Sequence, residues 1–289
     1  MPQDEFSAIW ISHSSISDYL KCPRAYYLNN IFKNPKTRRK ISLMQPPLAL
    51  GQIVHNVLDS ISKLPAEERF KIPLIDRYEQ SWQTVTGKKG GFRNEQEEKV
   101  YKERGELMIR RVMNNPGPLL QKTVKIKQEL PHYWLSEQDN LILCGRIDWL
   151  VYDEKNDCVQ ILDFKTGRVP EKGASLQLPI YYLLAKNCQS RDVTKACYWY
   201  LDRNDDLTEM KMPDPYQAEK VVLDAGRRIK LARQMEHFKC TSGNVEGCIH
   251  CAPLEVIVNG RAEFVGINEY NQEVYIMNHK VFDYSLTKE

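Results

Sequence analysis

The residue types best suited to chemistry are two aspartates and a lysine within one segment, GRIDWLVYDEKNDCVQILDFKTG, which contains Asp148, Asp163 and Lys165. Apolar and polar residues alternate on both sides of the polar run DEKND, a pattern typical of a β-hairpin. If the turn centres between Lys155 and Asn156, Asp148 lies opposite Asp163. Because side chains alternate faces along a strand, both aspartates then share a face with Lys165.

Two directly opposed carboxylates repel each other, so the predicted arrangement needs a counter-charge. A divalent cation would supply it, since Mg²⁺ and Mn²⁺ prefer hard oxygen ligands and complete their coordination with water and a substrate phosphate. Lys165 would then orient or help to deprotonate the attacking water. For these residues alone, the alternative is a surface hairpin with a charged turn and an ordinary Asp-x-Lys pair, because short motifs often match by chance.

Polar residues on other predicted elements extend this candidate site. His55 lies in an amphipathic helical pattern, which by itself favours a satisfied, partly buried histidine over a metal ligand. Gln177 and Tyr181 are four residues apart, so on a helix they share one face. Glu129 falls on a predicted strand near 124–135 and either reaches the site or is simply exposed.

The order and spacing of these residues resembles the PD-(D/E)XK nuclease superfamily, specifically its RecB-like exonuclease branch, which includes CRISPR-associated four-cysteine nucleases. The resemblance extends from about Ser12 to Cys251. The matching segments, in chain order, are ISHSSISDYLKCPRAYYL, GQIVHNVL, GRID, ILDFKTG and QLPIY. The resemblance implies an α/β fold with a restriction-endonuclease-like core, in which helices flank a mixed central sheet, with a helical insert and a C-terminal metal-cluster loop.

The resemblance also implies roles for individual residues. It assigns catalytic or strand-positioning roles to five side chains: Asp148, Asp163, Lys165, Gln177 and Tyr181. It assigns ligation of Mg²⁺ or Mn²⁺ to four groups: His55, Asp148, Asp163 and the backbone carbonyl of Phe164. The implied activity is phosphodiester hydrolysis in DNA, by an exonuclease acting on single-stranded ends.

Two other functions remain open from the sequence. One is a non-catalytic DNA-binding subunit of a repair or CRISPR-adaptation complex. The other is an α/β interaction protein whose fold is stabilised by a bound metal and which has no role in nucleic-acid chemistry. The complete set of motifs favours the nuclease over both.

The eight cysteines fall into two groups. Four lie in or beside predicted core elements and are expected to be buried: Cys144, Cys158, Cys188 and Cys197. By the resemblance, the other four bind a [4Fe–4S] cluster: Cys22, Cys240, Cys248 and Cys251. Here the third C-terminal cysteine precedes the C-x₂-C pair, whereas in the family it follows it. Zinc fits four thiolates equally well on spacing, and a site without metal is the third alternative.

Cysteine usage and hydropathy also predict the cellular environment. The sequence shows no signal-peptide pattern and no apolar run of membrane length. With eight cysteines, this predicts a reducing, cytoplasmic environment without membrane association.

A single nuclease domain is expected over residues 1–289. The expected helical parts are a first helix from Ser14 or Ser15 to about Leu28, the His55 helix, an insert at about 64–120 broken by GKKGG, the Gln177 helix, and a helix from Pro215 to about Phe238. The expected strands beyond the hairpin are one near 124–135, ACYWYL and LTEMKM. A loop at about 240–251 would be joined to Cys22, and a tail at 254–289 would form a hairpin from LEVIVNGRAEFVGI and QEVYIM.

The charge pattern is local rather than global, because the net charge is only +3. Basic residues cluster in five places: Lys36 to Lys40, Lys88–Lys89, Arg110–Arg111, Lys122 to Lys127, and Arg227 to Arg233. Each cluster alone is typical of a solvated face. A phosphate-binding role is expected for some of them only because a nuclease site needs a track for its substrate.

Overall fold

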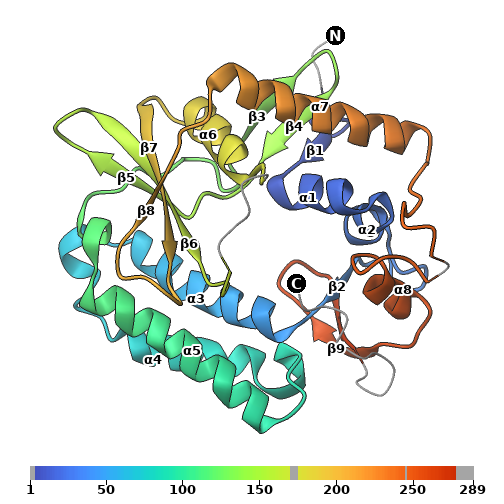
Figure 1. The fold of residues 1–289 in the computed structure, drawn as a ribbon, viewed down its shortest axis with the longest axis horizontal. Coiled ribbons are helices and arrows are strands. Elements are labelled where there is room, and N and C mark those ends of the chain that lie inside the picture. The colour runs from blue at the N-terminus through green and yellow to red at the C-terminus, as the bar shows by residue number, and fades with distance from the viewer. Residues whose placement is uncertain (1–3, 170–174, 245, 278–289) are drawn as a thin grey trace. The chain divides into compact units, whose positions relative to one another are not determined.

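The computed structural model describes residues 4–169, 175–244 and 246–277. The chain divides into two compact units. Unit 1 comprises Met1–His13, Leu50–Gln83 and Val100–Gly226, and unit 2 comprises Ser14–Ala49, Thr84–Lys99 and Arg227–Glu289. The predicted mixed α/β class is confirmed, with helices and three small mixed sheets in the described part of the chain (Figure 1).

The sheet that carries the two aspartates lies in unit 1. Its strands, in spatial order, are β5 (Trp149–Asp153), β6 (Cys158–Lys165), β7 (Asp192–Tyr200) and β8 (Thr208–Met210). β5 and β6 form the predicted antiparallel hairpin, in which Trp149 pairs with Leu162 across a turn at 154–157. This register confirms the predicted turn, and its continuation by one residue sets Asp148 opposite Asp163.

Both faces of β6 are buried. Leu162 and Phe164 on one face, and Ile161 and Asp163 on the other, are each at most 2% exposed. The predicted core face is therefore confirmed. The face of Asp163 is also covered, because α6 (Gln177–Cys188) packs against β6 and β7 (Figure 1). Asp163 is thus a fully buried carboxylate.

A second sheet of unit 1 has the order β1-β4-β3, formed by β1 (Ile9–Ile11), β4 (Leu141–Cys144) and β3 (His132–Ser136). The strand predicted near 124–135 was wrong at its beginning, since the observed strand starts only at His132. Residues 127–130 are bent, and Pro131, which has no N–H to donate to a ladder, directly precedes the strand. Strands β1 and β4 were not predicted, because three or four apolar residues do not by themselves indicate a strand.

The helices of the predicted insert form as expected. They are, in chain order, η2 (Ala66–Glu68), α4 (Leu74–Trp82), η3 (Gln83–Val85), η4 (Gly87–Gly90), α5 (Glu95–Asn114) and η5 (Gly117–Leu120). The predicted His55 helix, which precedes the insert, is α3 (Pro46–Ser62). The predicted break at GKKGG coincides with η4. The helix α7 (Pro215–Gln234) begins at the predicted residue and ends four residues earlier than expected.

A buried arginine ties three segments of unit 1 together. Arg69 is only 2% exposed, and its guanidinium lies 4.8 Å from the centre of the Trp149 ring. The guanidinium donates four hydrogen bonds, to the carbonyls of Leu64, Leu119 and Gln121 and to the hydroxyl of Thr123. These partners satisfy a buried cation without a carboxylate.

Arg69→Ala is expected to lower the free energy of unfolding by about 3 kcal/mol, because three carbonyls and a hydroxyl lose their donor in a buried place. Urea unfolding followed by circular dichroism measures the change. The control is Arg110→Ala, which removes an exposed ion pair to Glu106 one helical turn away and should change stability by less than about 0.5 kcal/mol. Equal effects of the two substitutions would contradict the role assigned to Arg69.

In unit 2 the predicted first helix is divided. It consists of α1 (His13–Lys21), α2 (Pro23–Tyr26) and the π-helical segment η1 (Tyr27–Ile31). The prediction of one continuous helix was wrong because Pro23 disfavours helical geometry in the residue before it. Cys22 accordingly has extended backbone angles, with φ −164° and ψ 117°.

The predicted C-terminal hairpin is correct in part. LEVIV does not form a strand but lies in α8 (Ala252–Val258), whose apolar side chains Leu254, Val256 and Ile257 are buried. The hairpin itself consists of β9 (Glu263–Ile267) and β10 (Glu273–Ile276), and β10 also pairs in parallel with β2 (Ile41–Leu43). Residues 278–289 of the predicted tail lie outside the described residues.

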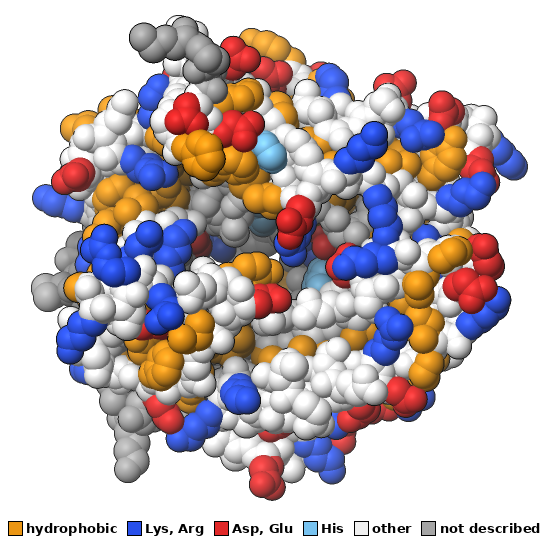
Figure 2. Space-filling view, turned by 180° about the vertical axis from the view of Figure 1, so that it is seen from behind, with side chains coloured by type: hydrophobic (Ala, Val, Ile, Leu, Met, Phe, Trp, Pro, Cys, Tyr) orange, Lys and Arg blue, Asp and Glu red, His pale blue; other side chains and the backbone are white. Residues whose placement is uncertain are grey.

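Acidic residues pair with four of the Lys and Arg residues in the basic clusters. On the face drawn in Figure 2, Lys and Arg side chains are interspersed with Asp and Glu. Ion pairs between cluster members and acids of the same unit are Lys88–Glu263, Arg110–Glu106, Arg111–Asp205 and Lys122–Glu154. These four cations are therefore poor candidates for a phosphate track.

The described residues contain no helix with both the length and the apolar character required to cross a membrane.

Candidate active site and cysteine site

The structure brings the predicted catalytic side chains together in unit 1. Asp148 lies directly before β5, and Asp163 and Lys165 lie at the end of β6. His55 is on α3, and Gln177 and Tyr181 are one turn apart at the start of α6. One hydrogen-bonded and ion-paired network includes Asp163, Lys165, Gln177 and Tyr181, and a second pairs Asp148 with His55.

Asp163 is the most unusual group of this site. Its Oδ1 accepts a hydrogen bond of 3.1 Å from Gln177 Nε2, and its Oδ2 lies 2.8 Å from Lys165 Nζ in an ion pair. This buried Oδ2 has no partner in hydrogen-bond geometry among the described residues. Burial and the charge of Asp148 raise the pKa of Asp163 to about 7, against the opposing influence of Lys165.

Asp148 is held by the backbone of the neighbouring strand. Its Oδ2 accepts a hydrogen bond of 3.0 Å from the Phe164 N–H and lies 3.3 Å from His55 Nδ1. Burial lowers the pKa of His55, but the hydrogen bond to Asp148 and the charges of Asp148 and Asp163 outweigh burial, so the net pKa is raised. His55 is therefore held next to Asp148, and the charge of Asp163 also acts on its imidazole.

Lys165 is oriented by three neighbours. Its Nζ pairs with Asp163, donates to the side-chain carbonyl of Gln177, and lies 4.5 Å from the centre of the Tyr198 ring. Gln177 in turn donates from Nε2 to the Tyr181 hydroxyl at 3.0 Å. Gln177 therefore connects the acid, the lysine and the tyrosine, which is a physical reason for its four-residue spacing from Tyr181.

Tyr198 is a site residue that the sequence did not indicate. It is the register partner of Asp163 across the parallel β6–β7 pair, and it is 2% exposed. Its ring face contacts the lysine cation, an interaction that is stronger when desolvated. The only signal would have been the pairing of β6 with β7, which residue spacing alone does not give.

The donor set suits a hard divalent cation. The two carboxylates belong to adjacent strand segments, and the buried Asp163 Oδ2 is balanced by the single ammonium of Lys165, 2.8 Å away, while Asp148 adds a second negative charge. Two acids beside one lysine leave negative charge that a divalent cation would neutralise. Oxygen ligands supplemented by water and phosphate are what Mg²⁺ and Mn²⁺ prefer. His55 and the backbone carbonyl of Phe164 would complete the set of metal ligands that the protein supplies.

A cleft of about 500 Å³ in unit 1 opens beside these groups. Its lining includes His55, Asp148 and Phe164. Three basic side chains line it as well: Lys63, Lys125 and Arg146. Glu129, which the sequence left either at the site or simply exposed, is an exposed residue of the same lining.

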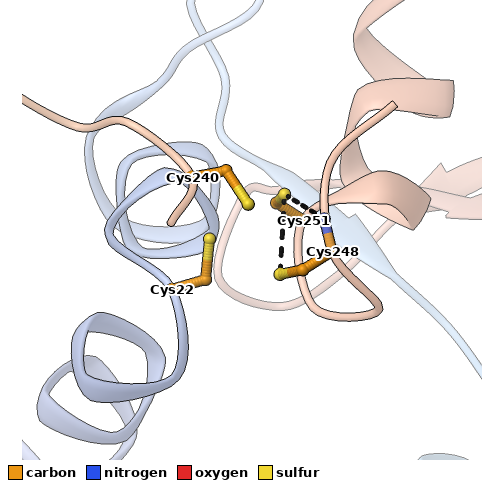
Figure 3. Close-up of side chains that lie close together, drawn as sticks. All are labelled: Cys22, Cys240, Cys248 and Cys251. Carbon is orange, nitrogen blue, oxygen red and sulfur yellow. Dashed lines mark hydrogen bonds between the residues drawn. The ribbon is translucent and has the colours of Figure 1, made fainter. Parts of the chain in front are cut away.

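In unit 2 the four remaining candidate ligands form one group. Figure 3 shows the side chains of Cys22, Cys240, Cys248 and Cys251 pointing toward one another, and their Sγ atoms all lie within 4.8 Å of one another. Cys22 and Cys251 are 0% exposed and belong to an apolar cluster with Ala25, Leu28, Ile41, Leu254 and Ile257.

The thiols of this group have unlike surroundings. Burial raises the pKa values of Cys22 and Cys251, whereas hydrogen bonds from Ser242 lower the pKa of Cys240 to about 6. All eight cysteines of the chain are free thiols, and Cys144, Cys158 and Cys197 are buried as predicted, with Cys188 partly buried.

Comparison with protein families gives one match. A sequence model of the PD-(D/E)XK nuclease superfamily matches residues 10–256, which include the His55-to-Tyr198 site and all four clustered cysteines. The comparison with curated proteins gives no match.

Proposed function

The chain belongs to the PD-(D/E)XK nuclease superfamily, and we propose that it is a RecB-like, Mg²⁺- or Mn²⁺-dependent deoxyribonuclease that acts from the ends of single-stranded DNA. The observation that carries the proposal is the buried Asp163 carboxylate, ion-paired with Lys165 and accompanied by a second acid, Asp148, whose charge acts on it. In this proposal both units belong to one nuclease domain over residues 1–289.

Each residue has a distinct part in the proposed reaction. Asp148, Asp163, His55 and the Phe164 carbonyl hold the divalent cation, which when bound supplies charge stabilisation at the phosphoryl oxygens and lowers the pKa of a bound water. Lys165, held by Asp163 and Gln177, orients the attacking water toward the phosphorus. Gln177 and Tyr181 keep Lys165 and the DNA strand in place. Most of the protein's contribution to catalysis is therefore the positioning of reacting groups.

A time course on 5′- and 3′-labelled oligonucleotides, single- and double-stranded, tests the activity. With Mn²⁺ or Mg²⁺ we expect products that shorten from the ends of the single strands, and no products after addition of EDTA. Internal cuts at early times would contradict end-directed cleavage. Salt-dependent binding without any cleavage in Mn²⁺ would instead identify a non-catalytic DNA-binding subunit.

The cleft beside the site suggests where the substrate strand runs. Lys125 and Arg146 are exposed basic residues of its lining, and Lys63 lies nearby, 4.0 Å from Asp59. Burial and, after it, the charge of Lys63 lower the pKa of Lys125, against the opposing charge of Asp59. The phosphates of the substrate strand that lie in this cleft are therefore proposed to contact Lys125 and Arg146.

The double substitution Lys125→Gln with Arg146→Gln is expected to raise KM for a single strand about tenfold, because two phosphate contacts are lost, and to leave kcat unchanged. The slope of log KM against log salt should fall by about 1.4, since each contact with a single strand contributes about 0.7. Steady-state assays at several salt concentrations measure both. A matched control is Lys155→Gln with Lys186→Gln, two exposed lysines of unit 1 that do not line the cleft. Equal KM shifts in the two double variants would contradict this path.

The cysteine group has a structural part in this proposal. A metal centre bound by four thiolates would tie the start of α2 to the segment before α8, two parts of unit 2 that are more than 200 residues apart in the chain. A cross-link of this kind stabilises a fold by coupling metal binding to folding.

A further inference from the structure

The spacing of the four thiol sulfurs carries information on the size of the metal centre. All four Sγ atoms lie within 4.8 Å of one another, and Cys248 Sγ is 3.8 Å from Cys251 Sγ. A zinc–sulfur bond of about 2.3 Å places the sulfurs of a tetrahedral site about 3.8 Å apart. The sulfurs of Cys248 and Cys251 therefore already have the separation of ligands that share one zinc ion.

A four-iron cluster places different demands on the same ligands. Each cysteine binds its own iron atom, so the iron atoms and the bridging sulfides lie between the thiolates and spread them. When every pair of sulfurs lies within 4.8 Å, little space remains between the four thiolates for a four-iron cluster. Two of the four residues, Cys22 and Cys251, are fully buried in packed apolar surroundings, so widening the group would disturb this core.

The loop before α8 restricts the site further. The Cys248 N–H donates to Cys251 Sγ at 3.3 Å, so the C-x₂-C turn wraps closely around one sulfur. Gly247 has φ +88°, and a Cβ atom at this position would lie 2.5 Å from Cys251 Sγ. A tight turn with backbone N–H donation to a thiolate holds the two sulfurs of the pair close enough to bind one ion.

From these distances we propose that the four cysteines bind a single tetrahedral Zn²⁺ ion as a structural site, and not a [4Fe–4S] cluster. The placement of Cys240 before the C-x₂-C pair agrees with this assignment, because a C-x₂-C pair supplemented by one upstream and one distant thiolate satisfies a four-coordinate ion. The four cysteines belong to unit 2, whereas the proposed catalytic residues belong to unit 1.

Metal analysis of the full-length protein tests the proposal. The protein is purified anaerobically from cells supplied with both iron and zinc, so that neither metal is limiting and a cluster would survive. We expect one zinc per chain, less than one-tenth of an iron per chain and a colourless protein. Four irons with acid-labile sulfide and a brown colour would overturn the proposal, and so would a protein without any bound metal.

Variants and metal replacement locate the zinc. Cys240→Ser should lose at least half of the bound zinc, whereas Cys158→Ser, which alters a buried thiol outside the group, should retain one zinc per chain. Replacement by Co²⁺ should give the visible absorption of tetrahedral thiolate coordination with one Co²⁺ per chain. If Cys240→Ser does not fold, the Co²⁺ spectrum of the unmodified chain shows whether the ion has tetrahedral thiolate coordination. Zinc that remains in Cys240→Ser, or a Co²⁺ spectrum of octahedral type, would contradict the assigned site.

Nuclease activity is measured separately and does not bear on this test. A zinc-containing protein that does not cleave DNA would refute the proposed nuclease function but support the zinc site. An active protein that contains an iron–sulfur cluster would support the nuclease function but refute the zinc site.

Discussion

Asp163→Asn is expected to reduce the rate of single-strand cleavage by about 10³-fold or more, which corresponds to about 4 kcal/mol of transition-state stabilisation. The substitution is nearly isosteric, and the Asn carbonyl can still accept the hydrogen bond from Gln177. What disappears is the negative charge on the buried Oδ2, which pairs with Lys165 and is proposed to hold the divalent cation. The loss should therefore reside in metal binding and chemistry rather than in folding.

Single-turnover cleavage of a labelled strand, at several Mn²⁺ concentrations, measures this effect. Thermal unfolding should show that Asp163→Asn still folds cooperatively, because the substitution is nearly isosteric, although loss of the carboxylate that pairs with Lys165 is expected to lower its stability. Asp192→Asn, an exposed aspartate at the start of β7, is the control in the same sheet and should cleave normally. An Asp163→Asn rate within tenfold of the unmodified rate would refute the assigned metal site.

The local part of this site was predictable because the hairpin specifies its own register. Burial of Trp149, Leu162 and Phe164 requires one face of the ribbon to be apolar, and the polar turn sets the pairing. With a side-chain period of two, a register slip of one residue would expose this apolar set. The same requirement that buries the core therefore sets Asp148 opposite Asp163.

The parts that could not be predicted depend on long-range contacts. Tyr198 joins the site through a parallel strand pair across a helix, which no local pattern specifies. The segment LEVIV suits either a strand or a buried helix, and only its packing around Leu254 and Ile257 makes it helical. The division of the first helix at Cys22, by contrast, follows from Pro23 alone, because a proline disfavours helical backbone angles in the residue before it.

Lys165→Met is expected to lower kcat by 10²- to 10³-fold, roughly the contribution of a positioned acid–base group, and to leave KM for DNA unchanged. Methionine keeps a long apolar stem that can pack against the Tyr198 ring, so the local packing should persist. The ammonium that Asp163 and Gln177 hold in place is lost, and with it the group that orients the attacking water.

The Mn²⁺ dependence separates this role from metal binding. A defect in a metal ligand is partly overcome by more Mn²⁺, because mass action refills a weakened site. Lys165 is not proposed as a ligand, so excess Mn²⁺ should leave the Lys165→Met rate low, even where it partly restores Asp148→Asn. Lys195→Met, which removes a surface lysine paired with Glu209 on the same sheet, should behave like the unmodified protein. Restoration of Lys165→Met to full activity by Mn²⁺ would place the lysine in metal binding instead and remove it from the chemical step.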